Sequence, residues 1–233
     1  MDQTNHGSAD HSAADHSAAD HTGPGIHTPR DPGAVEELWD QRYAGLEKLW
    51  SGQPNAVLVG ETRELRPGRA LDVGCGEGAD ALWLAEQGWQ VTALDVSTVA
   101  LDRAAGEAAA RGLRVHWLHA GLVEAALPPA SFDLVSAQYP ALLCTQGNLA
   151  EHALLAAVAP NGVLLVVHHP MPTAEEANAH GFDRRDYVSP ADVAALLDDT
   201  WQIEVDETRP RHLATGAGAH HTEDVVLRAR RRA

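Results

Sequence analysis

The sequence has few cysteines and no long apolar run. Its 233 residues include two cysteines, Cys75 and Cys144, which are too few for the disulfide framework of a small secreted domain. No segment approaches the roughly 20 uninterrupted apolar residues of a membrane helix. The polar, acidic N-terminus lacks the basic and then apolar stretch of a secretory signal. We therefore predict a reduced, cytoplasmic protein without a membrane span.

Basic residues are scarce beside acidic ones. The chain has 17 Lys and Arg against 33 Asp and Glu, which gives a formal net charge of −16. Such a field repels nucleic acid unless a local basic patch intervenes. The dense basic cluster, "RARRR" at 228–232, is short and close to the chain end, so we expect it to be solvated. The charge thus disfavours a nucleic-acid partner and favours a small-molecule substrate.

The first 33 residues have low complexity and repeat the motif "ADHSA". Histidine recurs every five residues from His6 to His21. A five-residue period turns a helix by about 500°, so successive histidines share no helical face. We predict that residues 1–33 form a disordered tail. The neighbouring Asp and His side chains suit weak binding of divalent Zn, Ni or Cu ions, but no preformed metal site is expected.

Strand and helix patterns alternate over residues 34–233, the predicted folded domain. An amphipathic helix interrupted near Gly45 is expected first, over 34–50. Short apolar strands are predicted at 69–73, 90–96, 114–120, 131–138 and 163–169, and helices at 79–88, 97–112, 148–162 and 189–199. The last two strands, 201–211 and 222–231, have no helical pattern between them and form an antiparallel pair.

This alternation predicts an α/β fold. Apolar strands separated by helices are typical of a Rossmann-like, doubly wound, mostly parallel sheet with helices on both faces. We expect seven strands and an antiparallel terminal edge strand. In such a sheet, ligands bind at the carboxyl ends of the strands, where the strand order reverses.

A glycine-rich loop follows the first of these strands. Three glycines occupy alternate positions from Gly74 to Gly78, where they permit close backbone approach to a ligand, and the next helix offers free N–H groups. Asp95 ends the second strand, where a carboxylate can accept both hydroxyls of a ribose. A nucleotide-like cofactor is the predicted occupant. Glu77 is expected to stabilise the helix start by its charge.

Asp72 separates two kinds of cofactor. A dinucleotide would bring an anionic pyrophosphate to this loop, and Asp72 would repel it. S-adenosylmethionine instead brings an ammonium group and a sulfonium, which a carboxylate attracts. The G-x-G-x-G spacing agrees with this choice, because the usual dinucleotide site has G-x-G-x-x-G. Ala79 stands where the third glycine would fall, a variant that some dinucleotide sites also have, so the spacing alone does not decide between the two cofactors and Asp72 does.

The stretch "LDVGCGEGADALWLAEQGWQVTALDVS", residues 71–97, resembles the cofactor site of class I S-adenosylmethionine-dependent methyltransferases. The segments "WDQRYAG" and "LWSGQPN" further resemble the subgroup that contains tellurite-resistance and other small-molecule methyltransferases. The resemblance implies a cofactor site in which the methionine end, the ribose and the adenine each have their own contacts. Its residues would be Asp72, Gly74, Cys75, Gly76, Asp95, Val96, Gly121, Leu122, Gln138 and Tyr43.

One position departs from the family. Members commonly have an acidic residue after the third strand to meet the adenine amino group, whereas this chain has Ala120, Gly121 and Leu122 there. A backbone carbonyl could take its place. Cys75 is expected to contribute its backbone N–H, and not a reactive thiolate.

Methyl transfer from a sulfonium needs alignment and a dry cavity, and a general base only if the acceptor must lose a proton. Tyr139 follows the fourth strand and His168 ends the fifth, so we predict these two as catalytic residues that face the acceptor. His169, His220 and His221 are weaker candidates, and Trp39 and Trp50 could form a lid with Tyr43. No metal ligands are assigned.

Two other functions are compatible with parts of the pattern. A nicotinamide-dependent oxidoreductase could use the same sheet, but Asp72 and the missing Tyr-x-x-x-Lys pattern disfavour it. A non-catalytic protein could bind S-adenosylmethionine as a sensor or buffer metal ions with the His-rich tail. Turnover separates an enzyme from such a binder.

Overall fold

The computed structural model describes residues 31–170, 186–211 and 222–233. The strands are β1 (Arg69–Val73), β2 (Gln90–Asp95), β3 (Val115–His119), β4 (Phe132–Gln138), β5 (Val158–His168), β6 (Trp201–Pro210) and β7 (Glu223–Arg231). The helices are α1 (Pro32–Ala44), α2 (Ala56–Thr62), α3 (Ala79–Glu86), α4 (Thr98–Arg111), α5 (Leu149–Ala157) and α7 (Pro190–Ala194). The predicted tail lies almost wholly outside the described residues, as do His220 and His221.

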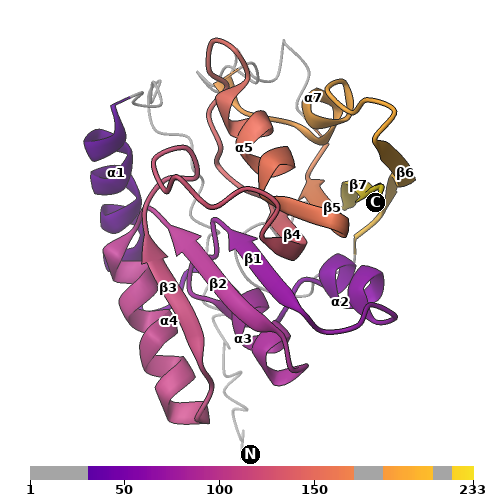
Figure 1. Cartoon of the computed structure of the whole chain (residues 1–233). Helices are drawn as coiled ribbons and strands as arrows, with labels where there is room; N and C mark the ends of the chain where they lie inside the picture. The colour runs from indigo at the N-terminus through magenta and orange to yellow at the C-terminus, as the bar shows by residue number, and fades with distance from the viewer. Residues whose placement is uncertain (1–30, 171–185, 212–221) are drawn as a thin grey trace, which may run out of the picture.

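The strands form one seven-stranded sheet in the order β3-β2-β1-β4-β5-β7-β6 (Figure 1). The first five strands are parallel. Strand β7 runs antiparallel between β5 and the edge strand β6. The predicted α/β class, with a mostly parallel sheet and an antiparallel pair at one edge, is therefore confirmed.

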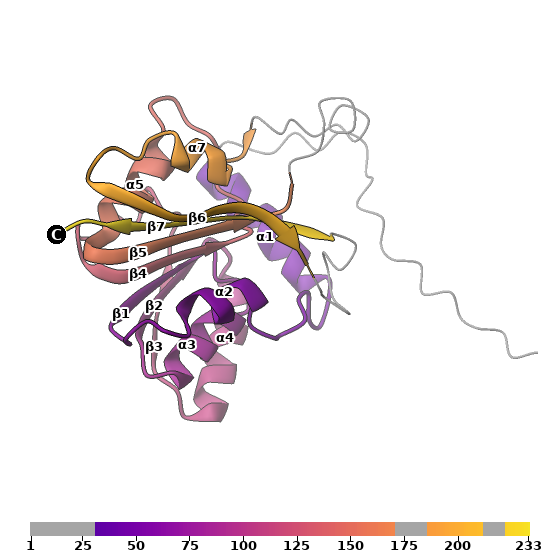
Figure 2. The same ribbon diagram turned by 90° about the vertical axis from the view of Figure 1, so that its right-hand side faces the viewer.

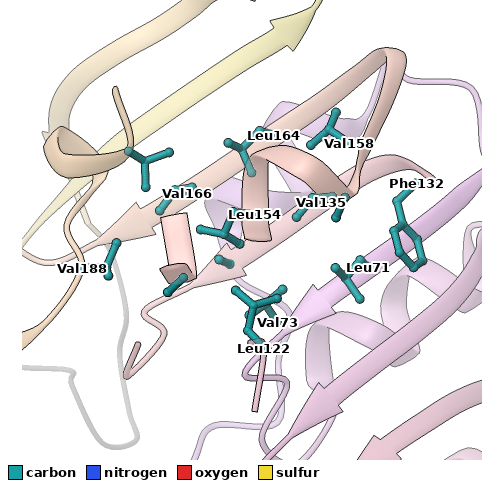
Figure 3. Close-up of a cluster of buried hydrophobic side chains, with 14 of the residues drawn as sticks. Leu71, Val73, Leu122, Phe132, Val135, Leu154, Val158, Leu164, Val166 and Val188 are labelled. Carbon is teal, nitrogen blue, oxygen red and sulfur yellow. The ribbon is translucent and has the colours of Figure 1, made fainter. Parts of the chain in front are cut away.

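Helices cover both faces of the sheet (Figure 2). Helices α2, α3 and α4 lie on one side, and α5 and α7 lie on the other. On the α5 side, apolar side chains of β1, β4 and β5 pack against Leu154 of α5 and Val188 (Figure 3). Each fully buried aliphatic side chain contributes about 1.5 to 3 kcal/mol, so this packing fixes the positions of the strand ends.

Local sequence signals place several helix ends as expected. The Ser97 hydroxyl accepts a hydrogen bond from the N–H of Ala100 at 3.1 Å and so begins α4, and Gly112 in the left-handed conformation ends it. Ser189 and Asp192 form a reciprocal capping box at the start of α7, where Pro190 occupies the first turn. Residues within a few positions of each end therefore provide these caps.

Three segments differ from the prediction. Helix α5 ends at Ala157, not near Gly162, because Val158 is fully buried and pairs with Phe132 as the first residue of β5. Helix α1 ends at Gly45 and residues 46–50 are not helical. Helix α2 was not predicted, since its seven residues include Gly60 and are too few for a clear period.

Candidate functional site

The switch in strand order lies between β1 and β4. From β1 the chain continues to β2 on one side, while β4 and β5 follow on the other. The carboxyl ends of β1, β2 and β4 therefore lie next to one another at the switch point, and open α/β sheets bind ligands in the crevice outside these ends. Most of the predicted site residues lie on these three ends or on the loops that follow them.

The loop after β1 is held open by backbone hydrogen bonds. The N–H groups of Gly74 and Cys75 both donate to the carbonyl of Leu94, at 2.9 and 3.0 Å. The N–H of Gly76 donates to Oδ2 of Asp95 at 2.8 Å. The loop is thus tied to the end of β2, so that the backbone and the Asp95 carboxylate form one rigid unit.

Gly76 is a position in this loop where a side chain has little room. Its φ is +52°, a left-handed conformation that disfavours other residues. A Cβ atom there would stand 2.7 Å from the hydroxyl oxygen of Tyr43 and 3.3 Å from Nε1 of Trp50. The backbone at Gly76 is therefore in contact with the segment that follows α1.

Replacing Gly76 by Ala should weaken cofactor binding about tenfold, because the loop or the Tyr43 segment must move to admit the methyl group. Titration calorimetry with S-adenosylmethionine measures the loss. The matched control is Gly106→Ala in the middle of α4, where a Cβ has nothing within 4 Å. The control should leave affinity unchanged and stabilise the fold by up to about 1 kcal/mol. Equal affinities in the two variants would show that the close approach at Gly76 is unimportant.

Two buried acceptor oxygens at the switch point have no partner. Asp72 and Gln138 are 2% and 8% exposed, and neither Oδ2 of Asp72 nor Oε1 of Gln138 accepts a hydrogen bond. Asp72 pairs in register with Ser136, which in turn accepts from Nε2 of Gln138 at 3.0 Å. Buried polar atoms without partners are rare, so these two oxygens point to a ligand that donates hydrogen bonds.

Three carboxylates gather here without a cation. Burial raises the pKa of Asp72 well above its usual value, and the neighbouring carboxylates of Asp80 and Asp95 raise it further. Burial also raises the pKa of Asp80 and of Asp95. Asp80 is held by Asn55, whose backbone and side-chain nitrogens both donate at 2.7 Å. No Lys or Arg among the described residues forms an ion pair with these three groups, so the site attracts a cation.

Asp95 has acceptor capacity left for a ligand. Its Oδ2 accepts from Gly76 and its Oδ1 accepts from the N–H of Ser97 at 2.9 Å. A carboxylate offers about four lone-pair sites, so two remain for the hydroxyls of a ribose. The structure thus leaves Asp95 able to hold both the loop and a sugar.

The segment from α1 to Trp50 lies over the glycine loop. Nε1 of Trp50 donates to the Tyr43 hydroxyl at 3.0 Å, and Tyr43 is buried against the loop. Glu77 accepts hydrogen bonds from the N–H groups of Leu49 and Trp50 and pairs with Arg103 at 2.9 Å. Glu77 therefore fastens this segment to α4, a larger role than the predicted effect on the start of α3.

Asp40 of α1 binds the start of α4, directly after the end of β2. Its carboxylate accepts from the hydroxyls of Ser97 and Thr98, at 2.6 and 2.9 Å, and from the N–H of Val99. The contact joins α1 to the start of α4, directly after Asp95 and Val96. No local sequence pattern indicates this contact, because the two segments are 57 residues apart.

Val96, Gly121 and Leu122 border the crevice on the β2–β3 side. Leu122 is buried, and a Cβ on Gly121 would lie 3.9 Å from the side chain of Val96. The same Cβ would collide with the carboxylate of Glu124. An acidic group thus reaches the position after β3 from three residues further on, where the sequence analysis found only Ala120, Gly121 and Leu122.

Tyr139 belongs to a polar cluster at the ends of β4, β5, β6 and β7. Its hydroxyl donates to Asp224 at 2.8 Å, its ring stacks on His169 with centroids 4.4 Å apart, and the Arg211 guanidinium lies 4.4 Å from the ring centre. Arg211 also pairs with Asp224 at 3.2 Å. Burial, with the Asp224 bond second, raises the pKa of Tyr139 above its usual value. These contacts fix the position of the Tyr139 ring, and the raised pKa favours the protonated hydroxyl.

His168 is mostly buried at the end of β5. Its Nδ1 lies 3.2 Å from the carbonyl oxygen of His169. Burial lowers its pKa, which favours the neutral imidazole. Cys75, in contrast, has a thiol pKa that burial and nearby Asp72 raise well above its usual value, so this cysteine is unreactive.

None of the helices in the described residues is long and apolar enough to cross a membrane. Within the same described ranges, no group of three or more His, Cys, Asp or Glu side chains could hold a metal ion. The predicted metal-binding repeat lies outside them.

Residues 70–162 match a family described as a methyltransferase domain. Over 88 residues the chain is 44% identical to the 2-heptyl-1-hydroxyquinolin-4(1H)-one methyltransferase of Mycobacteroides abscessus, and over 89 residues it is 43% identical to the ribosomal RNA small subunit methyltransferase C of Alcanivorax borkumensis. These stretches are 34% and 35% of this chain, and 39% and 27% of the two relatives. The chain therefore spans less than half the length of either relative.

A solved structure is similar over most of its length. The protein described under "Conversion of a Disulfide Bond into a Thioacetal Group during Echinomycin Biosynthesis" superposes with a TM-score of 0.68 at 25% sequence identity. The match covers 85% of this chain and 92% of the other. The similarity extends beyond the cofactor half of the sheet.

Proposed function

We propose that this chain, which belongs to the class I S-adenosylmethionine-dependent methyltransferases, transfers a methyl group to a small-molecule acceptor. The observation that carries the proposal is the group of three buried carboxylates, Asp72, Asp80 and Asp95, without a paired cation among the described residues. S-adenosylmethionine brings an ammonium and a sulfonium to such a site, whereas a dinucleotide brings a pyrophosphate that these groups repel.

Each part of the cofactor has a matching group in the crevice. The unpartnered oxygens of Asp72 and Gln138 accept hydrogen bonds from the ammonium, and Asp95 accepts them from the ribose hydroxyls. Val96 and Leu122 flank the adenine, and the backbone of the glycine loop supports the methionine end. The bound cofactor supplies a methyl group on a positively charged sulfur.

Glu124 completes the adenine contacts in this proposal. Its carboxylate lies over Gly121, where it can accept a hydrogen bond from the adenine amino group. The Glu124→Ala variant should bind S-adenosylhomocysteine about tenfold more weakly, which is the value of one hydrogen bond to a charged group. S-inosylhomocysteine lacks that amino group and should bind the variant and the parent protein equally. Equal weakening of both ligands in calorimetry would assign Glu124 to the fold and not to the adenine.

The acceptor is proposed to be small, with Tyr139 and His168 facing it. The net charge of −16 supports this, because it disfavours a polyanion. One relative is named for a hydroxyquinolone substrate and another for ribosomal RNA. The experiment therefore includes acceptors of both kinds, small molecules and ribosomal RNA. Transfer of a labelled methyl group to 2-heptyl-1-hydroxyquinolin-4(1H)-one, to other hydroxylated or thiol compounds, or to tellurite supports the proposal. Transfer to ribosomal RNA alone contradicts it.

Residues 34–233 are proposed as the methyltransferase domain, working in the cytoplasm, and the His-rich repeat as a weak divalent-metal binder. Asp31 accepts a hydrogen bond from the N–H of Ala34 at 3.1 Å and so begins α1. Deletion of residues 1–30 keeps this cap and should change S-adenosylmethionine affinity by less than twofold, while weak Zn²⁺ or Ni²⁺ binding is lost. Calorimetry measures both. A large loss of cofactor affinity would place the tail in the site.

A further inference from the structure

We infer that the methyl acceptor reaches the site as a neutral molecule with a hydroxyl, thiol or amine, and that Nε2 of His168 takes its proton. The inference rests on the proposed methyl transfer and narrows its acceptor class. It excludes acceptors that arrive as anions, such as metalloid oxyanions, which need no base.

The ends of β4 and β5 bring the backbone of His168 close to Gln138. Gln138, which has an unpartnered oxygen, pairs in register with Val167. The N–H of Tyr139 then donates to the carbonyl of Val167 at 2.8 Å. Adjacent strands lie about 4.8 Å apart, so the backbone of His168 is one residue beyond the partner of Gln138. An acceptor bound over the ends of β4 and β5 therefore lies next to the backbone of His168, and we infer that the imidazole reaches it there.

The hydrogen bond of His168 sets which ring nitrogen is basic. Nδ1 is 3.2 Å from the carbonyl oxygen of His169, which can only accept, so Nδ1 carries the hydrogen. In the neutral ring Nε2 then has the lone pair, and no described residue forms a hydrogen bond with it. Burial keeps the ring neutral by lowering its pKa. His168 is thus a free base in the correct tautomer.

The charges around this end of the sheet disfavour an anion. Asp72, Asp95 and Asp224 are buried there, and Glu151, 2% exposed in the first turn of α5, has an unpartnered carboxylate oxygen. The nearby cation, Arg211, is already paired with Asp224 at 3.2 Å and stacked on Tyr139. Among the residues that the structure describes, an anionic acceptor would meet carboxylates and no available cation, whereas a neutral acceptor avoids that repulsion.

The proton transfer balances the charge of the reaction. A lone pair of the acceptor forms a bond to the methyl carbon, the carbon–sulfur bond breaks, and its electrons go to sulfur, which becomes a neutral thioether. The acceptor's proton passes to Nε2 of His168, and the positive charge moves from sulfur to the imidazolium. The nearby carboxylates stabilise that imidazolium until water removes the proton.

Several titratable groups lie on the elements packed around the end of β5 and enter any pH profile. They are His169 directly after β5, Tyr139 after β4, Asp224 on β7 beside Val225, Glu151 on α5, and Cys144, Asp186 and Tyr187 in the paired segments 142–144 and 186–188. The hydrogen bond to the His169 carbonyl favours a protonated His168, but burial outweighs it and lowers the pKa. Activity should therefore rise with pH through an apparent pKa below 6.5 and then level off.

The first test needs no acceptor. We would record ¹⁵N NMR spectra of the imidazoles in the S-adenosylhomocysteine complex of the full chain at pH 7, with the His168 signals assigned by their loss in His168→Asn. The expected result is a neutral ring with hydrogen on Nδ1 and a bare Nε2. A protonated ring, or hydrogen on Nε2, would overturn the inference.

The second test compares probe acceptors with labelled S-adenosylmethionine. Phenol and 2-mercaptoethanol represent neutral acceptors, and tellurite and selenite represent anions. We expect methylation of a neutral probe, a roughly 100-fold lower kcat and a flattened pH profile in His168→Asn, and no change in His152→Asn, an exposed histidine of α5. Failure of every neutral probe, or an unchanged pH profile in His168→Asn, would sink the inference. Calorimetry with S-adenosylmethionine runs in parallel, because lost cofactor binding would sink the proposed function instead.

Discussion

The Asp95→Ala variant is expected to bind S-adenosylmethionine at least about 100-fold more weakly than the parent protein. Two effects add. The ribose loses two hydrogen bonds to a charged acceptor, each worth about 1.5 to 3 kcal/mol. The N–H groups of Gly76 and Ser97, which donate to Asp95 at 2.8 and 2.9 Å, lose their acceptor, so the glycine loop is no longer tied to β2.

Calorimetric titration with S-adenosylmethionine and S-adenosylhomocysteine measures the loss in Asp95→Ala, and thermal unfolding should show a lower midpoint for the ligand-free variant. Asp102→Ala, an exposed carboxylate on α4, is the matched control and should change neither quantity. If both ligands bound Asp95→Ala within a few-fold of the parent, the ribose would have to lie elsewhere.

Asp72→Asn should have opposite effects on binding and on stability. Replacing the buried carboxylate removes the charge that attracts the ammonium, so affinity for S-adenosylmethionine should fall about 10- to 100-fold. The ligand-free protein should become more stable, because it no longer buries a carboxylate that lacks a cation and stands near Asp80 and Asp95.

The pH dependence gives the sign of the stability change at Asp72. In the folded, ligand-free protein the pKa of Asp72 is raised above its unfolded value, first by burial and then by the neighbouring carboxylates. The folded chain therefore binds this proton more tightly than the unfolded chain, and stability falls as pH rises from about 4 through the raised pKa. Asp72→Asn should remove that part of the pH dependence.

Thermal unfolding of the ligand-free proteins between pH 4 and 8 tests the stability change, and calorimetry tests the affinity. The exposed carboxylate Asp206 on β6 provides the control as Asp206→Asn, which should leave both unchanged. The proposed role of Asp72 would be contradicted if Asp72→Asn bound S-adenosylmethionine with the parent's affinity, or if its unfolding midpoint at pH 8 were lower than the parent's. Either result would mean that partners within the fold stabilise the carboxylate and that it does not bind the cation of the cofactor.

The sequence was most informative where adjacent residues decide the structure. Ser97 and Gly112 begin and end α4, Ser189 begins α7, and the glycines after β1 turn the chain at the switch point. The ends that it missed depend on distant partners. Val158 joins β5 because Phe132 lies beside it, and the local stop signal, Pro160 to Gly162, stands beyond the observed end of α5 at Ala157.

The candidate site was predictable in its cofactor half and less so elsewhere. The spacing of Asp72, the glycines and Asp95 is contained in 24 consecutive residues, from Asp72 to Asp95, and their chemistry follows from that spacing. The Glu124 carboxylate, by contrast, lies over Gly121 because of the conformation of the loop after β3, which the sequence does not indicate. The Arg211–Asp224 pair joins the ends of β6 and β7 to Tyr139 only after the sheet has formed.

Calorimetric titration of the full chain with S-adenosylmethionine, S-adenosylhomocysteine and NADH tests the central claim most directly. The first two ligands bring a positively charged ammonium group to Asp72, whereas NADH brings a negatively charged pyrophosphate. We predict that the first two bind with micromolar dissociation constants and that NADH does not bind. Binding of NADH, without binding of S-adenosylmethionine, would contradict the charge assignment of the site and with it the proposed methyl transfer.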